Sequence, residues 1–83
     1  MKKSKKEFVP VEFNGSVPIL EFSGNRQVTV EGSTGVLQYE SEVIKINTKP
    51  MIIAFYGRRL NLKSISPMTV IIEGFITNTE FIF

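Results

Sequence analysis

The chain contains 83 residues, of which 42% are hydrophobic and 22% are charged, a balance typical of one globular domain with a modest core. It contains no histidine, no cysteine and no aspartate, so most metal-binding, redox and hydrolytic sites lack their usual residues. We therefore expect a protein that is not an enzyme and that uses neither a cofactor nor a metal.

Positive charge is concentrated near the N-terminus. Lys2, Lys3, Lys5 and Lys6 are four of the ten basic residues, and residues 7–83 carry six basic against eight acidic side chains. This slightly acidic balance does not favour a nucleic-acid-binding domain, which is usually basic over one face. The lysines predict a solvated tail, with electrostatic attachment to anionic lipid or nucleic acid as the alternative.

Two regions are expected, a basic flexible tail over residues 1–7 and a single all-β domain over residues 8–83. Within the domain, residues 8–13 surround Pro10 and are confined to a sheet edge or a loop. Alternating or continuous apolar runs between turn residues then predict strands, in chain order, over residues 19–22, 27–31, 37–39, 44–47, 51–56, 60–63, 68–73 and 81–83.

No segment shows the 3.6-residue apolar period of a helix. The predicted fold is therefore all-β, an antiparallel meander of about seven or eight short strands that forms a sandwich, a roll or a barrel-like sheet. Residues 51–56 are nearly all apolar and are expected to be the most buried strand. The side chains expected to face the core are Val28, Val30, Leu37, Tyr39, Ile44, Ile46, Ile53, Phe55, Leu60, Leu62, Val70, Ile72 and Phe81.

Glycine residues follow several of the apolar runs. Gly32, Gly57 and Gly74 are predicted to occupy structural turns or bulges, because glycine adopts positive φ without steric cost. The segment 57–59 is expected to be the turn into the strand over residues 60–63.

The candidate partner contacts are one basic pair and three aromatic residues. Arg58 and Arg59 follow Gly57 and could clamp an acidic group, although a solvated turn is the commoner role of such arginines. Phe75, Phe81 and Phe83 could line an interface or fold back over the sheet.

An acid–base pair is a remote alternative. Glu31 and Glu73 each precede a glycine at a predicted strand end and could approach each other if their strands were neighbours. A glutamate beside a turn more often faces solvent, and the sequence contains no phosphate-binding loop, dinucleotide fingerprint or metal-ligand spacing.

Over residues 17–83 the order of these segments resembles the YabP/YqfC family of small sporulation proteins, on its YqfC side. The resemblance departs from the family pattern at residues 51–56, where a dense apolar run replaces a more polar turn. The segments that carry it are residues 18–24, 28–32, 35–39, 43–48, 57–62 and 72–81.

The resemblance implies a role in endospore formation, in the mother cell and close to the developing spore envelope. It implies a membrane-embedded sporulation protein as the partner, and it offers no catalytic residue to carry over.

Because no apolar stretch in the sequence is long enough to span a bilayer, we expect a cytoplasmic protein, with peripheral attachment to the membrane around the forespore as a possible addition.

The sequence therefore predicts a non-enzymatic β-sheet binding or assembly module of sporulation. Such a sheet could also form a homo-oligomer through its strand edges, because residues 68–83 carry only two charged side chains, Glu73 and Glu80. The alternative function is a small β-barrel that binds nucleic acid through the lysine tail, Arg58 and Arg59.

Overall fold

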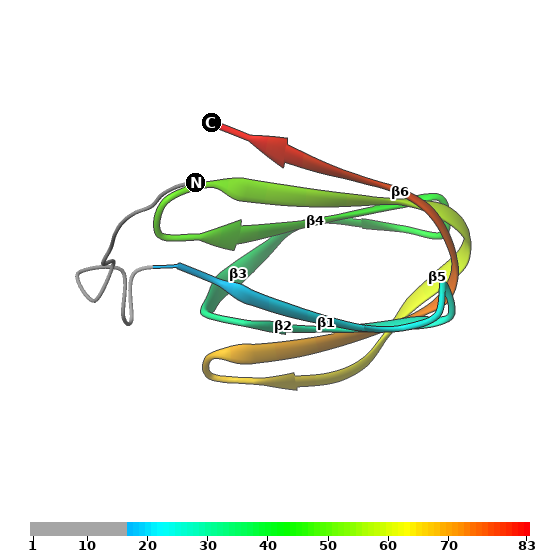
Figure 1. Ribbon diagram of the computed structural model, residues 1–83, viewed down its shortest axis with the longest axis horizontal. Coiled ribbons are helices and arrows are strands. Elements are labelled where there is room, and N and C mark those ends of the chain that lie inside the picture. Colours follow the sequence, from blue (N-terminus) through cyan, green and yellow to red (C-terminus); the bar gives the residue numbers. More distant parts are fainter. Residues whose placement is uncertain (1–16) are drawn as a thin grey trace, which may run out of the picture.

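The computed structural model describes residues 17–83, and within this range the chain is all-β and contains no helix (Figure 1). Its strands form one open sheet in the order β1-β2-β6-β5-β4-β3, with every neighbouring pair antiparallel. The predicted fold class is thus confirmed. The strands are β1 (Ile19–Ser23), β2 (Gln27–Glu31), β3 (Ser33–Glu40), β4 (Val43–Thr48), β5 (Ile52–Ser66) and β6 (Thr69–Ile82).

Six strands are present where seven or eight were predicted, because β5 and β6 each join two predicted strands. The segment 57–59 is not a turn but continues β5 through an irregular stretch of its ladder with β6. Residues 77–79 likewise lie inside β6, next to Phe75 and Ile76, which pair with the irregular stretch of β5. Bulges of this kind let a strand bend without ending, and Figure 1 shows β5 and β6 curving together at one end of the molecule.

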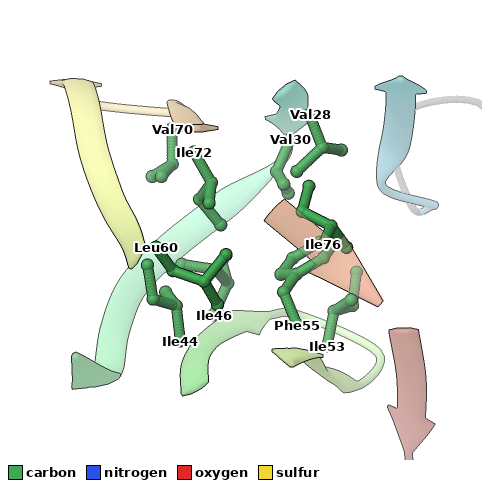
Figure 2. Close-up of a cluster of buried hydrophobic side chains, with 10 residues drawn as sticks. All are labelled: Val28, Val30, Ile44, Ile46, Ile53, Phe55, Leu60, Val70, Ile72 and Ile76. Carbon is green, nitrogen blue, oxygen red and sulfur yellow. The ribbon is translucent and has the colours of Figure 1, made fainter. Parts of the chain in front are cut away.

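The bends fold the sheet over itself into two layers. The first half of β5 and the second half of β6 extend the β3–β4 hairpin, whereas their other halves extend the β1–β2 hairpin. The core lies between these layers, and Figure 2 shows valines and isoleucines from β2 and β6 facing residues of β4 and β5. Its buried members are Val28, Val30, Ile44, Ile46, Ile53, Phe55, Leu60, Val70, Ile72 and Ile76.

Most of the predicted core is confirmed. Nine of the thirteen residues are buried, Leu62 packs partly buried against them, and Ile53, Ala54 and Phe55 are fully buried in the strand expected to be most covered. The prediction missed Ile76, which lies just beyond the bend of β6 and is 6% exposed.

Three predicted core residues, Leu37, Tyr39 and Phe81, are instead more than half exposed. Leu37 lies at a register shift of β3, which interrupts the two-residue alternation of its side chains. Tyr39 pairs with Ile44 but lies on the outermost strand of the sheet. Phe81 pairs with buried Ile53, in a part of β6 that has only β5 beside it among the described residues.

The positions of the edges follow from this pairing. β1 and β3 are the outer strands of the sheet. The first part of β6, residues 69–73, lies between β2 and β5, so its backbone is paired on both sides. The predicted tail over residues 1–7 and the segment 8–13 lie outside the described residues.

Candidate functional site

The β1–β2 and β3–β4 hairpin turns are each hydrogen-bonded to one of the two strand bends. In the β1–β2 turn, the carbonyl oxygens of Arg26 and Asn25 accept hydrogen bonds from the amides of Gly74 and Ile76 in β6, at 3.0 and 2.8 Å. In the β3–β4 turn, Glu42 and Ser41 accept from Gly57 and Leu60 in β5 in the same way, at 3.1 and 2.9 Å. These bonds satisfy amides at the irregular part of the β5–β6 ladder and fix the position of the bends.

Glycine is required where the backbones of the two bent, paired strands approach each other closely. A Cβ atom on Gly57 would collide with the backbone carbonyl of Phe75. Gly74 has a φ of 139°, and a Cβ there would lie 2.5 Å from the carbonyl oxygen of Arg59. Both glycines lie inside strands and not at turns. Gly32, with a φ of 100°, joins β2 to β3.

Two arginines approach one aromatic ring at this bend. The Arg26 guanidinium carbon lies 4.2 Å from the centre of the Phe75 ring, and that of Arg58 lies 5.6 Å from it. Both distances are within the range of a cation–π contact. Arg26 is also fixed by a hydrogen bond of 3.2 Å from its Nε to the carbonyl oxygen of Gly74. We call Arg26, Arg58, Arg59 and Phe75 the arginine cluster.

Arg59 completes the cluster in an unusual backbone conformation. Its φ of 55° is in the left-handed region, which costs a side-chain-bearing residue about 1 kcal/mol. Together with Arg26, Glu73 and Phe75, it lines an open surface pocket of about 470 Å³. A concave surface with two guanidinium groups, those of Arg26 and Arg59, is suited to bidentate contact with carboxylates or phosphates.

The structure brings together three of the five predicted contact residues and separates the other two. Arg58 pairs directly with Phe75, and Arg59 lies beside them, but Phe81 pairs with Ile53 further along β6. Phe81 lies six positions after Phe75, a distance of about 20 Å along an extended strand. Phe81 and Phe83 are therefore not part of the arginine cluster.

Arg26 belongs to the cluster although no motif in the sequence marks it as a contact residue. It is an isolated arginine in the turn between β1 and β2, and 32 residues separate it from Arg58. The only local signal was its place in a turn. Its proximity to Phe75 depends on the pairing of β2 with β6, which no local pattern reveals.

The remote alternative of a carboxylate pair is contradicted by the register. β2 and β6 are indeed neighbours, but Glu31 lies opposite Thr69 whereas Glu73 lies opposite Gln27, at the other end of the same ladder. Four residues of an extended strand separate the two positions by about 13 Å. That distance is too long for the paired carboxylates of a glycosidase.

One hydrogen bond on the outer face of the sheet gives a prediction about pH. Tyr56 donates its hydroxyl to Glu80 Oε1 at 2.8 Å, and this bond, with partial burial and the negative charge of Glu80, raises the pKa of Tyr56 above its ordinary 10.0. Stability from this bond is present below pH 10 and is lost as the pH rises through the raised pKa.

Glu80→Gln should lower the Tyr56 pKa. Tyrosinate absorbance is titrated for the wild type and for Glu80→Gln, and the titration of the same protein carrying Tyr56→Phe is subtracted from each, which leaves the signal of Tyr56. An unchanged Tyr56 pKa would contradict the hydrogen bond to Glu80.

A comparison with protein families finds a match over nearly all of the described residues. A model of the YabP family matches residues 16–82, a range that includes all six strands. The chain belongs to the YabP family. Membership of this family indicates a sporulation-related protein and confirms the resemblance at the level of the family, while its YqfC side stays a prediction. No curated protein matches the sequence. In the part of the chain that the structure describes, no helix is long and apolar enough to cross a membrane.

Proposed function

We propose that this YabP family protein is a non-enzymatic binding and assembly module that acts in the mother cell during endospore formation. In this role it contacts a membrane-embedded sporulation protein, the partner that the YqfC-like sequence pattern implies, and the arginine cluster is the contact surface. The proposal combines family membership with the chemistry of this one surface.

The observation that carries the proposal is the placement of two guanidinium groups around Phe75 beside the left-handed Arg59. Arginine and aromatic side chains are the residue types that dominate protein interfaces. The bonded hairpin turns hold the cluster in place before binding, so a partner would lose little entropy in ordering it. Acidic side chains on the partner would complement it.

Nucleic-acid binding is less well supported by the same surface. Residues 17–83 carry six basic and six acidic side chains, and Glu73 lines the pocket beside Arg26 and Arg59. A surface that follows a phosphate backbone needs a longer basic stripe than this cluster provides.

Charge reversal at the arginine cluster should abolish partner binding. We expect Arg58→Glu with Arg59→Glu to reduce recovery of the membrane-embedded partner on affinity purification from sporulating cells at least tenfold, because like charges would then face each other across the interface. The double variant should also impair spore formation.

Substitution of Lys2, Lys3, Lys5 and Lys6 by glutamine should leave spore formation largely intact.

The control is Lys45→Glu, which reverses one charge on β4, away from the arginine cluster, where the test variant reverses two. It should leave recovery of the partner unchanged. Arg58→Lys separates charge from geometry, since lysine keeps the charge but lacks the planar guanidinium. If the charge-reversed protein melts normally and still recovers the partner as the wild type does, the cluster is not the contact surface.

A further inference from the structure

Exposed apolar side chains gather at the end of the molecule opposite the arginine cluster. In Figure 1 the β2–β3, β4–β5 and β5–β6 turns and the start of β1 all lie at the left, whereas the bends of β5 and β6 lie at the right. Six of the nine large hydrophobic side chains that are exposed among the described residues belong to the left end. We call these six the apolar end: Val17, Ile19, Ile65, Met68, Phe81 and Phe83.

The turns at this end are held together by the backbone. The carbonyl oxygen of Met68, in the β5–β6 turn, accepts hydrogen bonds from the amides of Gly32 and Ser33 at 2.8 and 3.2 Å. Val17 and Met68 line the same two shallow pockets, one of which also includes Pro50 of the β4–β5 turn. The apolar side chains are therefore presented by a fixed arrangement of turns, with Met68 62% exposed.

The C-terminal part of β6 reaches the same end. Ile82 pairs with Ile52, the first residue of β5 after the β4–β5 turn. Phe83 follows it and is 94% exposed. A concentration of apolar surface like this marks a contact with a protein or with a membrane.

The charge of the chain next to this end favours a lipid surface. Lys2, Lys3, Lys5 and Lys6 precede Val17 by eleven to fifteen residues, so the lysine-rich segment joins the fold at the apolar end. At about 3.6 Å per residue, eleven residues keep Lys6 within about 40 Å of Val17. Each lysine near an anionic membrane adds to the affinity, but stable attachment of a peripheral protein needs a second, apolar signal.

We propose that the apolar end inserts into the interface of a membrane rich in anionic phospholipid, with the four N-terminal lysines bound to its headgroups. Lys49 lines one of the two pockets and Glu31, the last residue of β2, lines the other, so these two charges offset each other and the net positive charge comes from the N-terminal lysines. In this orientation the arginine cluster points away from the bilayer. The inference does not depend on what the arginine cluster binds.

Flotation of the purified full-length protein with vesicles tests the proposal. Binding is expected to vesicles of phosphatidylcholine rich in phosphatidylglycerol and to be weak with phosphatidylcholine alone. Ile65→Ser with Met68→Ser should lower the partition coefficient about tenfold or more. The wild-type side chains gain free energy when they move from water into the membrane interface, and serine does not. Glutamine at the four lysines should lower it by a similar factor and remove its dependence on salt.

Two further variants serve as controls. Leu37→Ser removes an equally exposed apolar side chain from the middle of β3, and Arg58→Glu alters the opposite end; both should bind vesicles as the wild type does. Thermal melts establish that every variant is folded.

Three outcomes would overturn the proposal. In the first, the wild type does not bind anionic vesicles. In the second, the lysine substitutions abolish binding while Ile65→Ser with Met68→Ser has no effect, which would make the tail the sole anchor. In the third, those two serines leave vesicle binding unchanged but convert a dimer to a monomer in sedimentation equilibrium, which would make the apolar end an interface between copies.

Discussion

Gly57→Ala and Gly74→Ala should each destabilise the fold by about 2 kcal/mol or more and lower the melting temperature by about 10 °C. At Gly57 the new methyl group would overlap the carbonyl of Phe75 in the paired strand, and backbone atoms cannot move aside as a flexible side chain can. At Gly74 the methyl group would meet the carbonyl of Arg59, and a φ of 139° adds strain. Calorimetric melts measure both effects.

Gly35→Ala is the matched control for these two variants. Gly35 also lies in a strand, but a Cβ added there meets no atom within 4 Å, and its φ is not in the positive range. Its melting temperature should stay close to that of the wild type. If all three variants melted at the same temperature, the close approach of the β5 and β6 backbones at the bend would be wrong.

Phe55→Ala should have the largest effect on stability, a loss of about 3 to 5 kcal/mol in the free energy of unfolding. Phe55 is fully buried between the layers, and its ring packs edge-on against Phe22 with the centroids 6.4 Å apart. Because an 83-residue domain has a total stability of only about 4 to 12 kcal/mol, the variant could be largely unfolded at 37 °C. Urea denaturation followed by circular dichroism measures the difference.

Phe83→Ala removes the same side chain from a position that is 94% exposed. It should change the free energy of unfolding by less than about 0.5 kcal/mol. A loss at Phe83 comparable with that at Phe55 would mean that the C-terminal residue is covered in solution, for example by a second copy.

The two ends of the molecule suit a module that joins other components. The bends of β5 and β6 carry charged and aromatic groups, whereas the turns at the opposite end carry aliphatic and aromatic side chains that are free of the core. In the two proposed roles, anionic lipid would meet the apolar end, and a part of the partner outside the bilayer would present acidic side chains to the arginine cluster. The vesicle and purification experiments test the surfaces separately.

The amino-acid sequence by itself determined the fold class and most of the core. Alternation such as that of Val28 with Val30 and of Ile44 with Ile46 identifies buried faces, because each residue of a strand turns its side chain to the opposite side from the last. The absence of histidine, cysteine and aspartate makes a binding function the expectation, and that expectation stays a prediction.

The tertiary structure decided whether each glycine ends a strand or bends it, and so decided the candidate site. Gly57 and Gly74 carry the local signature of turns, but their strands continue because the facing backbones and the two hairpin turns supply partners for the amides at the bends. That pairing places Arg26 beside Phe75 and exposes Leu37, Tyr39 and Phe81. Such proximities arise from contacts between residues far apart in the chain, and short-range alternation contains no information about them.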